Sequence, residues 1–389
     1  MARADAEHGI RSFARRAEGA AKVLSNADKG SRHALDAGQA SRDVRGAVVR
    51  TDKDSTRHIA AAGGPGGPGG PNLPGSGFAD EPEDLGVQEM IARRSAMLGI
   101  RTSAERAQEA SLLIEDNFLH VALVARQPRP ELLFGEREWA SYLNARVAAR
   151  RHGDQELTVP FIVDLHRRLS QFTMPEAGGV FTRPEGKRWG VMEYPLSDRE
   201  IAVVEANPRL TWLPPPTGPL DYGIIKYQSF PTREAVGDEL QSLCDWYNTA
   251  RRQPGHDPYQ LAAELQREFV AIHPWDQGYN GRTSRLLMNW SLERDGMPPS
   301  AVADFDRDLT MPLAEWADNV RAGSDAYSER ADRIERLGNS ADPVEVFGLE
   351  QERERYLELG GEPAPFTPGD QHDSAAYKTM LARLRGNGA

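Results

Sequence analysis

His273-Pro-Trp-Asp-Gln-Gly-Tyr-Asn-Gly-Arg-Thr-Ser-Arg285 is the segment of this chain that brings a histidine, two glycines and two arginines closest together. Asp257 followed by Pro258 predicts a helix start before it, with an N-cap and a proline at the first helical position. The apolar residues after that start recur every three or four positions, as on one helix face: Leu261, Leu265, Phe269 and Ile272. Behind the segment, a second apolar stripe predicts a helix that ends near Gly296: Leu286, Leu287 and Trp290. The sequence therefore predicts a helix, a short loop and a second helix.

The composition of the loop favours phosphate binding. Gly278 and Gly281 permit backbone conformations in which successive N–H groups turn toward one anion, and the second helix adds the positive end of its dipole. Arg282 and Arg285 stand three positions apart on its first turn, so they share a face and can bind phosphate oxygens bidentately. A neutral imidazole at His273 can take a proton from an attacking hydroxyl.

Two further loop residues complete the predicted phosphate site. Asp276 is the candidate ligand of a divalent metal, because Mg²⁺ accepts one or two carboxylates together with phosphate oxygens. Asn280 can donate a hydrogen bond from its amide to a phosphate oxygen. A solvated acidic residue in the loop is the alternative for Asp276.

The segment resembles the signature of the Fic family, His-Pro-Phe-x-(Asp/Glu)-Gly-Asn-Gly-Arg-x-x-Arg. The resemblance implies transfer of a nucleoside monophosphate, usually AMP from ATP, to a Ser, Thr or Tyr hydroxyl of a protein. It implies that His273 is the general base, that Asn280 and Gly281 form the anion hole, and that Arg282 and Arg285 hold the outer phosphates.

Two positions depart from this signature. Tyr279 is an extra residue between the glycine and the asparagine, and Gln277 stands where the metal carboxylate is expected. Either Asp276 takes the metal role from a bulged loop, or the acidic ligand is lost, since an amide is a poor Mg²⁺ ligand. Tyr279 either stacks on the nucleotide base or fills space.

The segment Ala110-Ser-Leu-Leu-Ile-Glu115-Asp-Asn117 resembles the inhibitory motif (Ser/Thr)-x-x-x-Glu-(Gly/Asn) of many Fic proteins, although Asp116 replaces the final Gly or Asn. An apolar stripe predicts one helix over residues 103–125 that carries this motif. The resemblance implies that Glu115 is inhibitory and competes with the ATP γ-phosphate for Arg285. An exposed helix carboxylate is the alternative.

The chain has 389 residues, 39% hydrophobic content and a mean hydropathy of −0.59, which indicates one large core and much polar length. Residues 1–84 are poor in large apolar side chains and include three Gly-Gly-Pro repeats at 63–71, so we predict a disordered tail and linker. A net charge of −11 disfavours a general nucleic-acid binder. The sequence has no signal or membrane-spanning segment and one cysteine, Cys244, which together favour the cytoplasm.

The predicted domain covers residues 85–338, and a charged tail follows at 339–389. Helices are expected at 87–98, 136–151, around 161–169, around 236–246 and at 311–337. The fold class is mainly α, a Fic-type helical bundle with a small β-hairpin flap and disordered tails at both ends. Two segments compete for the flap, 190–194 and 223–230, and 212–216 resembles an insertion.

These observations predict a protein adenylyltransferase that uses ATP and Mg²⁺, is autoinhibited by Glu115 and modifies a hydroxyl-bearing protein. One alternative is a catalytically impaired Fic-like protein that binds nucleotide and recruits partners. Another is a Fic enzyme that transfers a different phosphate-containing group or removes AMP. The sequence leaves open the target protein, the nucleotide and the oligomeric state.

Overall fold

The computed structural model describes residues 86–125, 129–133, 135–182, 189–191, 196–214, 223–275, 278–360 and 382–385. The predicted N-terminal tail at 1–84 lies outside these residues. The elements in chain order are α4 (Val87–Leu98), α5 (Ser103–Ala110), α6 (Asp116–Val124), η1 (Pro130–Leu132), α7 (Glu136–His152), α8 (Val159–Ser170), η2 (Pro175–Ala177), β1 (Trp189–Val191), α9 (Asp198–Ala206), β2 (Leu210–Leu213), β3 (Ile224–Tyr227), α10 (Arg233–Arg251), α11 (Pro258–Ile272), α12 (Asn280–Arg294), η3 (Phe305–Arg307), α13 (Leu313–Leu337), η4 (Gly338–Ser340), α14 (Pro343–Phe347) and α15 (Glu350–Glu358). The prediction of a mainly helical fold with a small sheet is confirmed.

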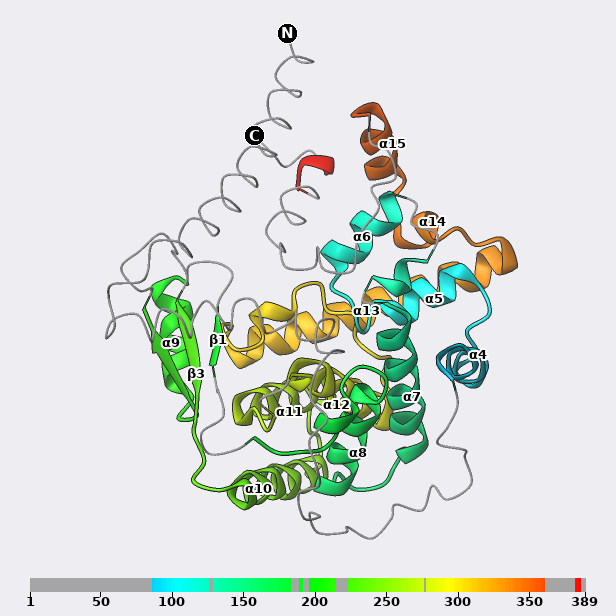
Figure 1. Cartoon of the computed structure of the whole chain (residues 1–389). Coiled ribbons are helices and arrows are strands. Elements are labelled where there is room, and N and C mark those ends of the chain that lie inside the picture. The colour runs from blue at the N-terminus through cyan, green and yellow to red at the C-terminus, as the bar shows by residue number, and fades with distance from the viewer. Residues whose placement is uncertain are drawn as a thin grey trace, which may run out of the picture. The chain divides into compact units, whose positions relative to one another are not determined.

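Helices α11 and α12 form the centre of the bundle (Figure 1). They pack against each other, α13 and α10 contact α11, and α7 and α8 contact α12. Their seam is almost fully buried and includes Phe269, Leu287 and Trp290. At the start of α11, the Asp257 carboxylate accepts hydrogen bonds from the backbone N–H groups of Tyr259 and Gln260. The predicted N-cap is confirmed, and the central helix pair supports the loop between α11 and α12.

The flap is a three-stranded antiparallel sheet with the order β1-β3-β2. It lies beside α9, to the left of the helices in Figure 1. Both candidate segments therefore contribute to one sheet, since β1 pairs with β3. Of the segment 212–216, which is predicted to be an insertion, Trp212 and Leu213 belong to β2, and residues 215–216 lie outside the described residues. Trp212 packs across Gly223, where a Cβ would lie 1.9 Å from its ring.

The predicted helix over 103–125 is two helices, α5 and α6, separated at Ser111–Glu115. The Ser111 hydroxyl donates to the Gln108 carbonyl, and Glu115 adopts an extended conformation with ψ 144°. Leu112, Leu113 and Ile114 are all buried. Three consecutive side chains on a regular helix spread over about 200° of its surface, so burying all three there requires neighbours on more than one side, as at Val270, Ala271 and Ile272 of α11. The break buries all three, and it makes Glu115 the N-cap of α6.

The chain after residue 339 is folded over much of its length. Helices α14 and α15 contribute Val346, Phe347 and Tyr356 to the main core, and both contact α6. A disordered C-terminal tail is therefore a wrong prediction for these two helices. Residues 382–384, near the end of the chain, are also helical. Among the described residues, the helices are too short or too polar to cross a lipid bilayer.

Candidate active site

The loop between α11 and α12 combines three residues with positive φ. His273 ends α11 at φ 49°, Gly278 has φ 99°, and Tyr279 precedes α12 at φ 62°. His273 and Tyr279 are the only non-glycine residues with positive φ in the described part of the chain. Such a conformation costs a residue with a Cβ about 1–2 kcal/mol. Strain concentrated in one turn is typical of functional sites, where the surrounding contacts must hold it in place.

The Asn280 side chain ties the loop together. Its Oδ1 accepts a hydrogen bond from the Trp275 backbone N–H at 3.1 Å, and its Nδ2 donates to the Trp275 carbonyl at 2.6 Å. The same Nδ2 lies 3.2 Å from Nε2 of His273. Asn280 is 4% exposed, and its amide joins the histidine end of the loop to the first turn of α12.

These bonds define the state of the His273 imidazole. The Trp275 N–H can only donate, so the Asn280 side-chain atom that it contacts is the oxygen Oδ1. The amide nitrogen of Asn280 is therefore the atom that faces His273. Because an amide nitrogen only donates, Nε2 of His273 accepts, and its lone pair points toward the start of α12. The Tyr227 ring from β3 stacks on the imidazole at 4.0 Å with an interplanar angle of 14°. The flap therefore contacts the candidate base directly, which the loop sequence alone did not indicate.

A buried aromatic pair supports the loop from below. His166 on α8 is fully buried and stacks on Trp275 with ring centroids 3.7 Å apart. The Gly179 backbone N–H donates to its Nδ1 at 2.8 Å. Burial lowers the pKa of His166 to about 3, which a backbone hydrogen bond to Gly278 only partly opposes, so the ring is neutral. His166 is thus a packed, neutral ring that supports the loop.

Tyr279, the extra residue of the loop, points into the protein. It is 6% exposed, and its hydroxyl donates to Oε2 of Glu138 at 3.1 Å and shares a hydrogen bond with the Thr173 hydroxyl. Burial and the Glu138 carboxylate raise the pKa of Tyr279 above its ordinary value, so the phenol stays protonated. The ring is a packed, hydrogen-bonded part of the core, which agrees with the space-filling alternative and disfavours stacking on a nucleotide base.

The two arginines of the first turn of α12 have different partners. Arg282 donates from Nη1 to Oε1 of Glu138 on α7, and its guanidinium lies 5.0 Å from the Tyr279 ring centroid. Arg285 donates from Nη2 to the Leu113 carbonyl at 3.3 Å. Its Nη1 also lies 3.4 Å from the position that a Cβ would take at Gly281. Arg285 therefore folds back along the turn toward the start of the helix, where a phosphate would bind.

Glu115 and Arg285 both contact Phe305. The Arg285 guanidinium lies 4.0 Å above the Phe305 ring, and the Phe305 backbone N–H donates to Oε1 of Glu115 at 3.1 Å. Glu115 is 8% exposed, so it is not the exposed carboxylate of the alternative interpretation. The break between α5 and α6 places the Leu113 carbonyl at Arg285 and the Glu115 carboxylate at the Phe305 backbone.

Asp276 and Gln277 lie outside the described residues, so Asp276 as a metal ligand stays a prediction. Among the described residues, no three His, Cys, Asp or Glu side chains gather in a group suited to a metal ion. Mg²⁺ at a phosphate site needs only one or two carboxylates, because the phosphates and water supply the other oxygens. Asp276 is the residue of this loop that would hold it.

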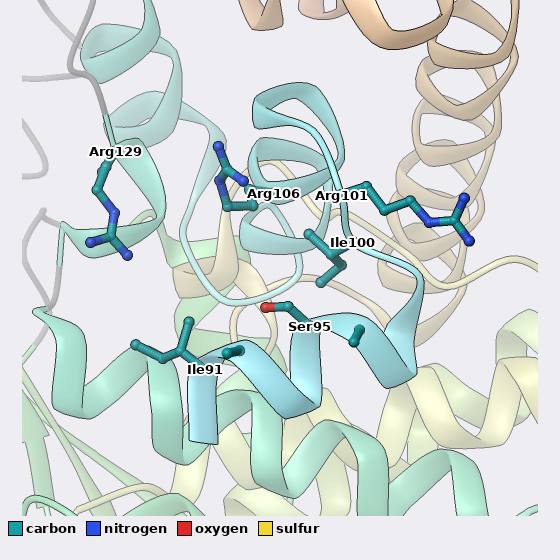
Figure 2. A pocket seen from close by; sticks show the side chains of 8 residues that line it. Ile91, Ser95, Ile100, Arg101, Arg106 and Arg129 are labelled. Atoms are coloured by element: carbon teal, nitrogen blue, oxygen red, sulfur yellow. The ribbon is translucent and has the colours of Figure 1, made fainter. Parts of the chain in front are cut away.

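A cavity of about 550 Å³ lies away from this loop, between α4 and the start of α5. Ile91, Ser95 and Ile100 line it, together with Arg101, Arg106 and Arg129. Figure 2 shows the three guanidinium groups pointing in different directions. Arg106 and Arg129 lie 3.6 and 3.2 Å from the buried carboxylate of Glu131. Their charge is therefore partly neutralised within the protein.

Comparison with known proteins shows which family the segment around the loop resembles. The Fic/DOC family model matches residues 156–292. A uridine 5'-monophosphate transferase of Xanthomonas campestris pv. campestris is 36% identical over 77 residues, which are 18% of this chain and 14% of that protein. Protein adenylyltransferase Fic of Drosophila willistoni is 30% identical over 166 residues, 43% of this chain and 25% of that protein.

A solved Fic family protein from Desulfovibrio desulfuricans has a TM-score of 0.33 and 18% identity, and the match covers 70% of this chain and 84% of that one. The matches with the two curated relatives cover a quarter or less of the length of those proteins. The matched range 156–292 contains α8, the flap and the whole loop between α11 and α12. Residues 156–292 of this chain are therefore a Fic/DOC family domain.

Proposed function

We propose that this protein is a nucleotidyltransferase that moves AMP from ATP onto a Ser, Thr or Tyr hydroxyl of another protein. The observation that carries this proposal is the Nε2 lone pair of His273 beside the N-terminus of α12. A proton acceptor, a helix N-terminus and two arginines within one turn suit transfer of a phosphoryl-linked group. The names of the two curated relatives, an adenylyltransferase and a uridine monophosphate transferase, support the same class of reaction.

In the proposed reaction, the triphosphate binds at the start of α12, with Arg282 and Arg285 on its oxygens. The target hydroxyl displaces the Asn280 amide at Nε2 of His273 and gives its proton to that nitrogen. The hydroxyl oxygen then forms a bond to the α-phosphorus, and the bond to pyrophosphate breaks. Positioning and charge stabilisation supply most of the rate acceleration in such transfers. A Mg²⁺ ion held by Asp276 would neutralise charge on the phosphates.

We also propose that Glu115 inhibits transfer. Glu115 and Arg285 both contact Phe305, and Arg285 binds the Leu113 carbonyl two residues before Glu115, which supports a role of this segment at the second arginine. A carboxylate at Arg285 competes with the outer phosphate of ATP for the same cation. Contacts from the C-terminal helices hold α6, since the Phe347 ring packs edge-on against His120 and Arg353 donates to the Val124 carbonyl.

Labelled nucleotide tests both proposals. The full chain is incubated with candidate protein targets and α-labelled ATP, and in parallel with α-labelled UTP, because one relative is named for UMP transfer. We expect label from ATP on protein, loss of that label in His273→Ala, and more label in Glu115→Gly. Stronger labelling from UTP would overturn the choice of nucleotide. Equal or weaker labelling by Glu115→Gly would contradict autoinhibition.

A binding protein without transferase activity is the second candidate. It is favoured by the hydrogen bond that Asn280 makes to the lone pair of His273 and by the carboxylate that pairs with Arg282. ATP binding by calorimetry, with no label from either nucleotide in the wild type and in Glu115→Gly, would establish this candidate over the enzyme.

A further inference from the structure

Glu138 is a buried carboxylate that contacts the candidate site from α7. Its side chain is 5% exposed, and it accepts hydrogen bonds from the Tyr279 hydroxyl on one oxygen and from Arg282 on the other. It is separated from Arg282 by 144 residues of sequence, so the pair exists only because α7 packs against α12. A carboxylate with two donors on its two oxygens has a fixed orientation.

Arg282 is correspondingly fixed. Nη1 binds Glu138, the face of the guanidinium lies over the Tyr279 ring, and its side chain is 13% exposed. A guanidinium carries five N–H donors, so one arginine can bind a carboxylate and phosphate oxygens at the same time. Tyr279 thus contacts Arg282 both directly and through Glu138.

We propose that Glu138 is a positioning residue, which with Tyr279 holds the Arg282 guanidinium in the orientation that transfer requires. This inference rests on the proposed function of the same site. The extra residue of the loop then has a role, because its hydroxyl orients the carboxylate and its ring supports the guanidinium. The strained backbone of Tyr279 is offset by these contacts.

Removing the charge of Glu138 distinguishes a positioning role from two others, masking of Arg282 and stabilisation of the fold. Removing this negative charge increases the attraction between the loop and a polyphosphate, so nucleotide binding should not weaken. The released guanidinium can rotate, so a contact needed in the transition state is lost and kcat falls. A carboxylate that merely masked Arg282 would give a higher kcat in the variant, and one that only stabilised the fold would affect both constants together.

The kinetic test uses labelled ATP turnover and ATP binding by calorimetry on the full chain and its Glu138→Gln variant. We expect kcat to fall at least about tenfold while the Kd for ATP stays within about threefold or becomes tighter. Tyr279→Phe should lower kcat in the same direction by less. In an Arg282→Ala background, Glu138→Gln should cause less than about twofold further loss. A rise in kcat, a parallel loss of binding, or a full further loss without Arg282 would each overturn the proposal.

A chemical test works without enzymatic activity. Phenylglyoxal modifies accessible arginines, and mass spectrometry of the peptides gives the rate at each site. We expect Glu138→Gln to accelerate modification of Arg282 severalfold. The matched control is Glu131→Gln, another buried carboxylate that pairs with arginines, which should accelerate modification of Arg129 and leave Arg282 unchanged. An unchanged rate at Arg282 in Glu138→Gln would overturn the positioning role, whereas a wild-type chain that transfers nothing would overturn only the proposed function.

Discussion

Replacing Asp116 with Asn tests how firmly the segment that carries Glu115 is held. Asp116 begins α6, and its Oδ2 accepts a hydrogen bond from Arg330 on α13 at 3.1 Å. The two side chains are 13% and 9% exposed, and the Arg330 guanidinium also lies 4.2 Å above the Phe347 ring. The substitution keeps an acceptor oxygen and removes the charge, so Arg330 is left buried without its counter-charge.

The magnitude follows from this burial. Removing one partner of a buried ion pair costs about 3–5 kcal/mol, and an acid at a helix N-terminus contributes about 0.3–1 kcal/mol. Because Asn still accepts a hydrogen bond and both groups retain some exposure, we expect a loss of about 2–3 kcal/mol in the free energy of unfolding. In a domain of this size that corresponds to a fall in Tm of roughly 5–10 °C. Since Asp116 follows Glu115 directly, transfer activity should rise.

Urea unfolding gives the free energy, and labelled-ATP transfer gives the activity. The control is Glu315→Gln, which removes one partner of an exposed pair with Arg199 and should change stability by less than about 0.5 kcal/mol. A loss no larger than that of the control would refute the argument that the Asp116–Arg330 pair is buried. A large loss of stability without increased transfer would support the buried Asp116–Arg330 pair and contradict its link to inhibition.

Three further predictions concern other parts of the chain. Burial lowers the pKa of His120 to about 4, so the unfolded chain binds more protons than the folded chain below pH 6.5. The free energy of unfolding should therefore fall as the pH drops from 6.5 toward 4, by up to about 3 kcal/mol from this residue. His120→Gln should flatten this pH dependence in urea unfolding. Gly223→Ala puts a Cβ against the Trp212 ring, so the flap should become more sensitive to limited proteolysis while ATP binding by calorimetry is unchanged. Tyr247→Phe removes the buried hydrogen bond to Ser291, 2.9 Å long, and should lower stability by about 1 kcal/mol in the same unfolding assay, with an unchanged m-value.

The helices on either side of the loop were predictable because their signals are local. The N-cap at Asp257 and the apolar spacing of α11 depend on residues within a few turns of one another, and the structure confirms them. The break at Ser111–Glu115 was not predictable in the same way. The spacing there fits one helix, and the break involves a contact with a distant part of the chain, the hydrogen bond from the Phe305 N–H to Glu115. A helical period cannot report how many sides of a segment are covered by the rest of the fold.

The side chains around the loop show the same limit. Glu138, Tyr227 and Phe305 contact the candidate catalytic segment from α7, β3 and η3, and no spacing within residues 273–285 points to them. One clue was present in Tyr279. An extra residue that can donate a hydrogen bond, in a loop that otherwise resembles a fixed signature, requires a buried acceptor if it points inward.

Glu138, which binds Arg282, and Glu115, the proposed inhibitor at Arg285, are held differently. Glu138 belongs to α7, a 17-residue helix that is buried along most of its length and packs against α4, α8 and α12. Glu115 is the N-cap residue of α6, a nine-residue helix that contacts η1, α14 and α15. A contact in the middle of a long buried helix opens only with much of the fold, whereas one at the end of a nine-residue helix involves a shorter segment of the chain. Arg282 is thus suited to constant orientation, and Arg285 is the cation whose surroundings a change in the C-terminal helices can alter.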